Sequence, residues 1–315
     1  MPLVVAVVGP TATGKSDLGV ALAHRLGGEV VGADASQLYR GMDVGTAKLT
    51  PEEREGVPHH QLDVLDVTEE ATVAGYQRHA RADLDAVLGR GKVPLVVGGS
   101  GLYVRALLDR LDIPPTDPDV RRRLEQRAGA EGTAALLDEL RAVDPAAAEA
   151  IEPRNTRRIV RALEVVELTG RPFSATMPTR ESLRPTLLLG LRTDREGLDR
   201  RIERRTRRMF DSGLVEETRA LVDLGLREGR TASRAVGYAQ ALAVIDGTAT
   251  VEEAVVDTAL RTRRLVRRQE SWFGADPRVH WLDARDPDLV DRAEALVEEA
   301  GAAARRGRWD DGAHG

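Results

Sequence analysis

A short segment near the start of the chain constrains the fold more than any other feature. It has the spacing Gly-x4-Gly-Lys-Ser, follows directly on the apolar run 3–8, and reads Gly9, Pro10, Thr11, Ala12, Thr13, Gly14, Lys15, Ser16. In such a P-loop, glycines let the backbone wrap closely around phosphate oxygens, and successive N–H groups and the next helix N-terminus point at them. Lys15 adds a positive charge, and the Ser16 hydroxyl can ligate Mg²⁺. The segment therefore predicts a site for a diphosphate or triphosphate.

Composition narrows the class of protein. A chain of 315 residues is long enough for one large α/β domain or for a domain with a sizeable insertion. It contains no cysteine, which excludes disulfides, thiolate zinc sites and a cysteine nucleophile. The N-terminus has no basic leader, and no apolar run reaches the ~18 residues that a membrane span requires. We therefore expect a cytoplasmic protein with no membrane association, and nothing in the sequence requires more than a monomer.

The distribution of positive charge is more informative than its sum. The net charge of −5 argues against a nucleic-acid partner, and an arginine-rich composition with lysine only at Lys15, Lys48 and Lys92 is typical of a GC-rich genome. Helical periodicity nevertheless groups arginines on one face of segment 197–209 and again within 251–273: Arg201, Arg204, Arg205 and Arg208 in the first, and Arg261, Arg264, Arg267 and Arg268 in the second. One such cluster alone is typical of a solvated helix face paired with glutamates. Two clusters in a chain with a P-loop favour polyanion binding.

Apolar patterns predict how the chain is organised. Strands are predicted over 3–8, 29–32 and 93–97, with helices over 17–26 and 73–88 between them. This alternation is typical of an α/β fold in which helices cover a P-loop NTPase-like parallel sheet. A proline break at 112–118 precedes helical patterns over 120–127, 133–143 and 155–169, and a second break at 172–185 precedes a strand over 186–191. We therefore expect a catalytic core of 1–112 and 186–301, a helical insertion domain of 113–185 and a disordered tail of 302–315.

The strand ends distinguish this chain from an ordinary ATPase or GTPase. The strand over 93–97 ends in Gly98, Gly99 and Ser100, where a Walker-B-type carboxylate would serve Mg²⁺ and water activation. A carboxylate, Asp34, instead follows the strand over 29–32, at the sheet edge where open α/β folds bind ligands. Asp34 is placed to accept a proton from a nucleophile beside the P-loop. The long polar loops over 41–48 and 57–63 indicate an acceptor site more elaborate than attack by water requires.

In these motifs the chain resembles the tRNA dimethylallyltransferase (tRNA isopentenyltransferase) family. The matching segments occur in family order and are 9–16, 34–48, 58–60, 98–103, 155–158, 161–165, 236–238 and 263–272. The resemblance implies transfer of a dimethylallyl group from dimethylallyl diphosphate to N6 of adenine 37, next to the anticodon, in tRNAs that read codons beginning with U. Pyrophosphate is released and no ATP is consumed, which agrees with a P-loop that lacks a Walker-B acid.

The resemblance also implies roles for individual residues. Asp34 would take the N6 proton, while Arg205, with Arg201 as its neighbour, would stabilise the leaving pyrophosphate together with Lys15, the P-loop amides and Mg²⁺ at Ser16. The Ser100 hydroxyl, at a position where the family more often has threonine, would bond the diphosphate or the nucleoside. Ala35 and Gly274 replace a usual serine and a common arginine, so a hydroxyl contact near the base would come from Ser36. The implied tRNA contacts are Asp34, Ala35, Ser36, Gln37, Ser100, Arg122, Arg157, Arg158, Arg161, Arg234, Gly237, Tyr238, Arg267 and Arg268.

Several residues also have plainer interpretations. The three arginines of 157–161 fit a surface helix whose partners are Glu164 and Glu167. The aromatic rings of Tyr39 and Tyr103 fit core or loop packing as well as substrate contact. His59 and His60 lack further ligands at metal-binding spacing, which favours a role in ordering the loop.

Three other functions remain as alternatives. An adenylate isopentenyltransferase would prenylate a free nucleotide, but the helical insertion and the downstream arginine segments favour a polynucleotide acceptor. A small-molecule kinase would use the P-loop for ATP and Asp34 as a base, and the Gly98, Gly99, Ser100 strand end argues against it. An RNA-binding NTPase without transferase activity would leave Asp34 with no task.

Overall fold

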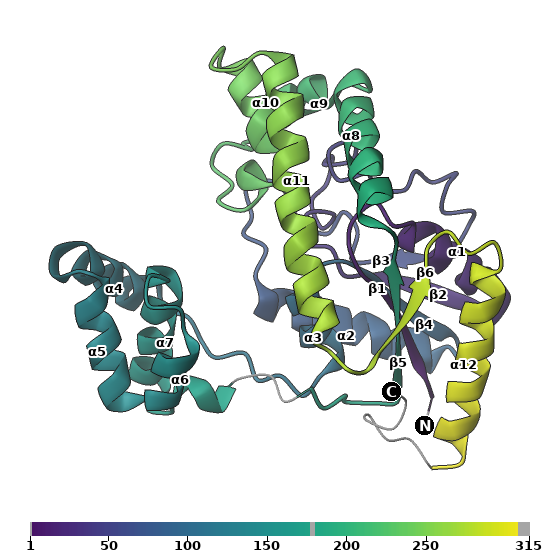
Figure 1. Cartoon of the computed structure of the whole chain (residues 1–315), viewed down its shortest axis with the longest axis horizontal. Coiled ribbons are helices and arrows are strands. Elements are labelled where there is room, and N and C mark those ends of the chain that lie inside the picture. The colour runs from purple at the N-terminus through teal and green to yellow at the C-terminus, as the bar shows by residue number, and fades with distance from the viewer. Residues whose placement is uncertain (1, 177–179, 308–315) are drawn as a thin grey trace. The chain divides into compact units, whose positions relative to one another are not determined.

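One parallel sheet forms the core of the larger of the two units described below (Figure 1). In the computed structural model, which describes residues 2–176 and 180–307, six strands stand in the order β3-β2-β4-β1-β5-β6. Each neighbouring pair is parallel, and the strands are β1 Val4–Val8, β2 Gly28–Gly32, β3 His59–His60, β4 Val93–Gly98, β5 Thr186–Arg192 and β6 Val279–Asp283. Parallel neighbours require crossover connections, which place helices over both faces. The predicted α/β fold is confirmed.

Alternating side chains of the central strand contribute to two separate cores. Val4, Ala6 and Val8 pack beneath α2 (Val73–Gly89) and α3 (Gly101–Leu108). Val5 and Val7 face the other way, toward α1 (Lys15–Leu26) and α12 (Leu289–Arg305). Because successive residues of a strand point to opposite faces, an unbroken run of valines and alanine buries both sides of the sheet. The two cores fix β1, and with it the start of the P-loop.

Strand register brings three loops to one edge of the sheet. Val8, the last residue of β1, pairs with Gly98 of β4, while Gly32 at the end of β2 pairs with Val97. Beyond the strands, the Ala33 amide donates to the Val97 carbonyl at 2.8 Å, and the Ser100 amide donates to the Ala33 carbonyl at 3.1 Å. The chain therefore leaves β1, β2 and β4 at the same level, which places the P-loop, Asp34 and Ser100 side by side.

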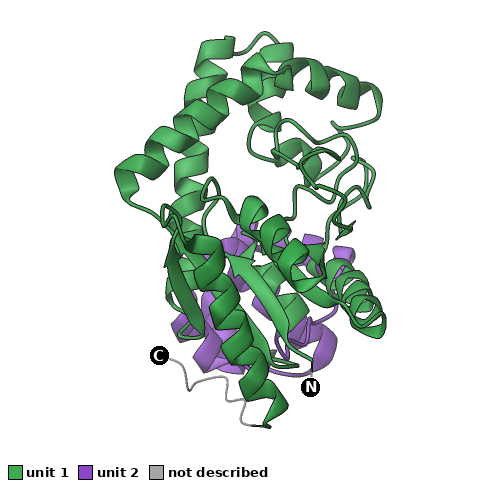
Figure 2. Ribbon diagram, turned by 90° about the vertical axis from the view of Figure 1, so that its right-hand side faces the viewer, with its two compact units in different colours: residues 1–108, 182–315 green, residues 109–181 purple. Residues whose placement is uncertain are grey.

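Helices beyond this edge complete the larger of two compact units, residues 1–108 with 182–315 (green in Figure 2). They are α8 (Arg195–Asp211), α9 (Leu214–Asp223), α10 (Tyr238–Ile245) and α11 (Val251–Gly274), with a short 3₁₀ turn, η2, at Ala232–Arg234. The α8 and α11 helices pack through a small apolar cluster that includes Ile202 and Val266. Together with the loops that follow β1, β2 and β4, the helix α8 lines the cavity described below.

Residues 109–181 form the second unit (purple in Figure 2). It contains α4 (Pro118–Glu131), α5 (Thr133–Val143), α6 (Pro145–Ala150), α7 (Thr156–Thr169) and a 3₁₀ turn, η1, at Phe173–Thr176. Leucines and isoleucines of α4, α5 and α7 form its own core. The side chains of Asp117, Asp144 and Asn155 cap three of these helices, as expected for short polar residues at an N-cap. The unit boundaries lie four residues before the expected 113–185 at both ends.

The C-terminal expectation was partly wrong. We expected a disordered tail from residue 302, but α12 continues to Arg305. Ala303 and Ala304 are buried there and extend the helical stripe of small apolar residues formed by Ala293, Val297 and Ala300. The remainder of the predicted tail, from residue 308, lies outside the described residues. Among the described helices, none has the length and apolarity to cross a membrane.

Candidate active site

The three loops and α8 surround a cavity of about 830 Å³. The loop after β1 contributes Thr11, the start of α1 contributes Lys15 and Ser16, and the loop after β2 contributes Asp34 and Gln37. Gly98 and Gly99 line it at the end of β4. The fourth wall is α8, which contributes Arg201, Arg204, Arg205 and Arg208. The predicted arginine face of this helix is thus confirmed, and it borders the predicted phosphate site.

The P-loop has the backbone that its glycines allow. Gly9 has a φ of +128°, and a Cβ built there would lie 2.7 Å from the Leu191 carbonyl oxygen. Gly14 has a φ of +86° and caps α1 in the left-handed region. Side chains are strained in both positions, because L-residues rarely adopt these angles. Thr13 donates through Oγ1 to the Pro10 carbonyl at 2.8 Å, which closes the turn from inside. The loop ends where α1 begins, at Lys15.

Two positive groups of the site, Lys15 and Arg205, are buried. Burial lowers the pKa of Lys15 to about 7, an effect that Asp34 opposes and Arg205 reinforces. Burial also lowers the pKa of Arg205, again opposed by Asp34. Arg205 donates through Nη1 to Thr11 Oγ1 at 3.0 Å and through Nη2 to the Thr46 carbonyl at 3.2 Å. An anion between these cations would relieve their mutual repulsion and favour their charged forms.

Asp34 lies at the carboxyl end of β2 and is held by the residues that follow it. Its Oδ1 accepts from the Ser36 amide at 3.0 Å and from the Ser36 hydroxyl at 2.7 Å. The Ser36 hydroxyl thus contacts Asp34, whereas residue 35 is alanine and has no hydroxyl. The Ala35 amide in turn donates to Ser100 Oγ at 3.2 Å, which joins the loops after β2 and β4. Ser36 thus fixes the orientation of the Asp34 carboxylate through Oδ1.

Gln269 of α11 joins two parts of the site and was not predicted from the sequence. Its Oε1 accepts from the Thr11 amide at 3.0 Å, and its Nε2 donates to the Gly99 carbonyl at 3.0 Å. The P-loop and the end of β4 are thus connected through one buried amide. A signal was available in the sequence, because Gln269 stands at helical spacing between the buried Val266 and Phe273. A polar residue in an apolar stripe requires a partner when it is buried.

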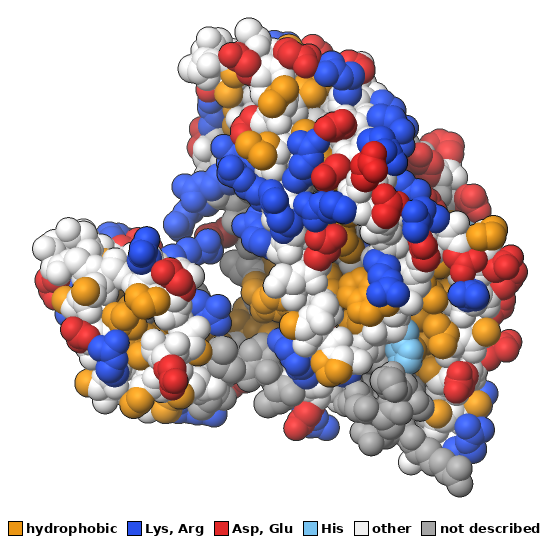
Figure 3. Space-filling view, in the orientation of Figure 1, with side chains coloured by type: hydrophobic (Ala, Val, Ile, Leu, Met, Phe, Trp, Pro, Cys, Tyr) orange, Lys and Arg blue, Asp and Glu red, His pale blue; other side chains and the backbone are white. Residues whose placement is uncertain are grey.

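The residues proposed to contact RNA lie in both units and differ in exposure. Arg267 and Arg268 are exposed on α11, where Figure 3 shows basic side chains gathered over the middle of the helix. Arg234 and Gly237 lie beside the start of α10. Tyr238 is 0% exposed, backbone included, so it presents no surface to RNA in this structure. In the second unit Arg157 and Arg158 are exposed, as is Arg122, which pairs with Asp119 at 2.9 Å.

Arg161 is bonded to groups of its own unit. Its guanidinium donates to the carbonyls of Pro114 and Pro115 at 2.8 and 2.9 Å, and to Glu164 Oε2 at 2.8 Å. The Glu164 side chain is 0% exposed and also accepts from Arg121. A buried carboxylate requires such partners, so Arg161 serves the packing of its own unit, as the plainer interpretation held. Glu167 pairs with Arg123 instead.

The aromatic and histidine residues also follow their plainer interpretations. Tyr39 and Tyr103 are buried in apolar clusters, and the Tyr103 ring lies 4.4 Å from that of Tyr76. Nδ1 of His59 lies 2.8 Å from the Val57 carbonyl, and Nε2 of His60 lies 2.7 Å from Glu29. Both histidines thus order their loop. Residues 2–176 and 180–307 contain no group of three His, Cys, Asp or Glu side chains able to hold a metal.

The fold and the cavity define a class: a P-loop-like α/β protein in which Asp34 lines one cavity with Lys15 and Arg205, and β4 ends in glycines rather than in a Walker-B acid. A family model described as IPP transferase matches residues 37–276. Among curated relatives, the tRNA dimethylallyltransferase of Kineococcus radiotolerans is 61% identical over 313 residues, covering 96% of this chain and 98% of its own. That of Kocuria rhizophila is 60% identical over 291 residues, covering 92% of each chain. The chain belongs to the IPP transferase family, and it is an enzyme of the transferase class.

Solved structures agree with this assignment. The crystal structure of the tRNA isopentenylpyrophosphate transferase of Bacillus halodurans has a TM-score of 0.72 and 38% identity, and the match covers 98% of this chain and 99% of that one. A eukaryotic dimethylallyltransferase described as acting on tRNA has a TM-score of 0.81 and 26% identity, over 98% of this chain and 81% of that one. The resemblance inferred from the motifs is confirmed.

Proposed function

We propose that this chain transfers a dimethylallyl group from dimethylallyl diphosphate to N6 of adenine 37, next to the anticodon, in tRNAs that read codons beginning with U. Pyrophosphate is the second product, and the protein acts in the cytoplasm as a monomer. The observation that carries the proposal is the position of Asp34 in one cavity with Lys15 and Arg205, at a sheet edge without a Walker-B acid. The names of the relatives, which describe dimethylallyl transfer and tRNA, support the choice of substrates.

The acceptor requires a base. The lone pair of an adenine N6 is delocalised into the purine ring, so N6 attacks the allylic carbon well only as it loses a proton. Asp34, with Oδ1 held by Ser36, presents Oδ2 for that proton. A base in this position contributes on the order of 10²- to 10⁴-fold. The new bond joins N6 to the allylic carbon, the bond from that carbon to the diphosphate oxygen breaks, and the proton passes to Asp34.

The leaving group requires positive charge. As the carbon–oxygen bond breaks, negative charge builds up on the pyrophosphate, and preorganised donors around it lower the barrier. Lys15, Arg205 and the P-loop amides are the donors that this chain offers. Arg205 is already oriented by Thr11 and by the Thr46 carbonyl, so it needs no large rearrangement when the donor binds.

The donor set of the cavity fits Mg²⁺. This ion keeps several waters, binds substrate phosphates and takes only one or two protein oxygens. The Ser16 hydroxyl lines the cavity at the start of α1, with the Asp17 carboxylate beside it, whereas the described residues hold no cage of three acidic or histidine side chains. Ser16 would hold the ion, which would neutralise part of the diphosphate charge.

The RNA is proposed to approach through exposed arginines of both units. Arg157, Arg158 and Arg122 of residues 109–181 would contact the anticodon arm, and Arg267 and Arg268 of α11 would contact backbone phosphates. Gln37 and Ser36 would lie around the target base. Leaving a single-stranded loop costs a base less stacking energy than leaving a duplex, so an anticodon loop suits a cavity of this kind.

Release of pyrophosphate tests the proposal. Purified protein is mixed with Mg²⁺ and dimethylallyl diphosphate, with an anticodon stem-loop that carries two adjacent adenines at positions 36 and 37, with AMP, or with no acceptor. We expect release that depends on the stem-loop and is unaffected by ATP. Release with AMP alone would indicate the free-nucleotide activity, and consumption of ATP without prenyl transfer would indicate a kinase.

A further inference from the structure

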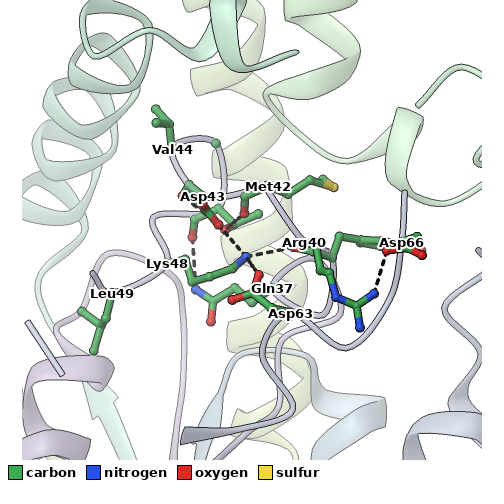
Figure 4. Close-up of polar contacts among 12 residues, drawn as sticks. Gln37, Arg40, Met42, Asp43, Val44, Lys48, Leu49, Asp63 and Asp66 are labelled. Atoms are coloured by element: carbon green, nitrogen blue, oxygen red, sulfur yellow. Dashed lines mark hydrogen bonds and ion pairs between the residues drawn. The ribbon is translucent and has the colours of Figure 1, made fainter. Parts of the chain in front are cut away.

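Residues 37–48 are here called the bridging loop. The buried side chain of the last residue, Lys48, fixes the conformation of this loop (Figure 4). The Lys48 side chain is 2% exposed, and its Nζ donates to Asp63 Oδ1 at 2.5 Å and to Asp43 Oδ1 at 2.6 Å. Its third donor reaches the Tyr39 carbonyl at 2.9 Å. All three protons of the ammonium group are therefore used, and the start and end of the loop are held together.

The same loop is fixed on another side by a carboxylate. Glu217 of α9 accepts through Oε2 from the amides of Asp43 and Val44 at 3.2 and 2.8 Å. Its Oε1 accepts from the Gly45 amide at 3.4 Å and from the Tyr238 hydroxyl at 2.5 Å. Successive amides that converge on one anion form a nest, and here the protein itself supplies the anion.

The bridging loop presents one carbonyl to both halves of the candidate active site. The Thr46 carbonyl accepts from Gln37 Nε2 at 3.2 Å and from Arg205 Nη2 at 3.2 Å. Gln37 belongs to the proposed acceptor side, and Arg205 belongs to the diphosphate side. Gly45 permits the close approach, because a Cβ there would lie 2.5 Å from the Tyr238 ring. The orientation of Arg205 thus depends on where Glu217 holds the peptide units before Thr46.

We propose that Glu217, with the Tyr238 hydroxyl, is a positioning residue for diphosphate binding. It holds the amides of 43–45, these set the Thr46 carbonyl, and that carbonyl orients Arg205 toward the P-loop. The inference rests on the proposed function for the identity of the donor. It also gives the Val236, Gly237, Tyr238 motif a task inside the protein, distinct from RNA contact.

Binding of inorganic pyrophosphate in the presence of Mg²⁺, measured by titration calorimetry, tests this inference. We expect Glu217→Gln to weaken pyrophosphate binding about tenfold, which is the magnitude at which residues of one hydrogen-bond network couple. The reason is that the glutamine NH₂ group would either face a backbone N–H of the loop, which cannot accept a hydrogen bond, or turn away from it. Glu216→Gln is the matched control, because Glu216 has the same charge, is exposed and lies on the same turn of α9. Binding by this control should equal that of the wild type.

A double-mutant cycle with Arg205→Ala separates positioning from general stability. If Glu217 acts through Arg205, then Glu217→Gln added to Arg205→Ala should weaken pyrophosphate binding no further. An equal loss in both backgrounds would show that Glu217 merely supports the fold, and unchanged binding by the single variant would overturn the inference outright. Thermal unfolding of each variant confirms that the assay temperature lies below the transition.

Tyr238→Phe provides a second variant that keeps the buried ring and removes one hydrogen bond to Glu217. We expect a smaller loss of affinity, about threefold, that also vanishes in the Arg205→Ala background. If Glu217→Gln does not fold, pyrophosphate binding by Tyr238→Phe is sufficient to test the inference. The assay needs no prenyl transfer, so its failure is distinct from failure of the proposed function: a wild type that binds pyrophosphate but transfers nothing would contradict only the latter.

Discussion

Two helices that carry clustered arginines, α7 and α8, place some of these charges in different surroundings. On α8, Arg201, Arg204 and Arg205 line the cavity. On α7, Arg161 is bonded to the buried Glu164 three residues on. The sequence around each residue explains the difference, because the three α8 arginines have no acid at a spacing of three or four, whereas Arg161 does. The absence of an acid at helical spacing distinguishes Arg201, Arg204 and Arg205 from Arg161, but it is not a general rule, because Arg208 also lines the cavity and has Asp211 three residues on.

The largest loss of prenyl transfer is expected from a substitution of Asp34, which lines the same cavity as the α8 arginines. If α8 serves the donor and Asp34 serves the acceptor, Asp34→Asn should reduce single-turnover transfer by about 10²- to 10⁴-fold, because the proton from N6 loses its acceptor. RNA affinity, measured by fluorescence anisotropy with the same stem-loop, should change little. A parallel loss of affinity and turnover would instead make Asp34 an RNA contact.

Arg205→Ala tests the use of the α8 face. We expect kcat/KM for dimethylallyl diphosphate to fall on the order of 10²-fold, since one preorganised donor to the leaving group is removed. RNA affinity should stay near that of the wild type. If the dependence of the rate on donor concentration is unaltered, the arginines of α8 do not serve the donor, and the contrast with α7 fails.

The pH dependence of pyrophosphate binding tests the cluster formed by Lys15, Arg205 and Asp34. Because the pKa of Lys15 is lowered to about 7, Lys15 is protonated below pH 7 with or without donor, and its contribution to binding is constant there. Above pH 7 the free protein loses this proton and the complex retains it, so pyrophosphate affinity should weaken by up to about tenfold per pH unit. Calorimetry between pH 7 and 9 measures this, and Lys15→Arg, which stays charged, should show a flatter profile. Equal slopes would contradict the assignment.

Arg157 and Arg158 sharpen the comparison on α7, since neither has an acid at a spacing of three or four. Replacing both with alanine should weaken stem-loop binding and lower the slope of log affinity against log salt by about 1 for each phosphate that the protein no longer neutralises. The donor KM should not change. An unaltered salt slope would remove these residues from the RNA interface.

Arg161→Ala should have the smallest effect on activity and a measurable effect on stability. Removing its bonds to Glu164 and to the carbonyls of 114 and 115 should cost about 2 kcal/mol in urea unfolding, with Arg121 remaining as a partner of the buried carboxylate. Arg157→Ala is the control on the exposed face. If the free energy of RNA binding falls by more than the free energy of unfolding, Arg161 contacts the RNA.

Local sequence rules predicted those parts of the molecule whose signals lie close together in the chain. The P-loop, β1, α1 and the parallel sheet follow from a contiguous motif and an apolar alternation, and the arginine face of α8 follows from periodicity. The strand β6 was not predicted, because its five residues include His280 and Trp281 and are only partly buried at the sheet edge. Such a strand lacks the continuous apolar run that marks a buried one.

The parts of the site that were not predicted are those joined across long separations. Gln269 meets Thr11 across 258 residues, and Glu217 meets Val44 across 173. Nothing in the sequence near these residues specifies such contacts, which arise when α9 and α11 pack over the sheet edge. Asp34 and Lys15 from the motifs, and Arg205 from the family resemblance, could thus be predicted as candidate site residues, and they line one cavity, whereas the side chains that contact their loops required the structure.

Mass analysis of the acceptor tests the central claim most directly. The stem-loop with adenines 36 and 37 is incubated with protein, Mg²⁺ and dimethylallyl diphosphate, and AMP is treated in parallel. The account predicts a gain of one dimethylallyl group on the RNA, lost when adenine 37 is replaced, and no gain on AMP. An RNA of unchanged mass, with or without a prenylated AMP, would contradict it.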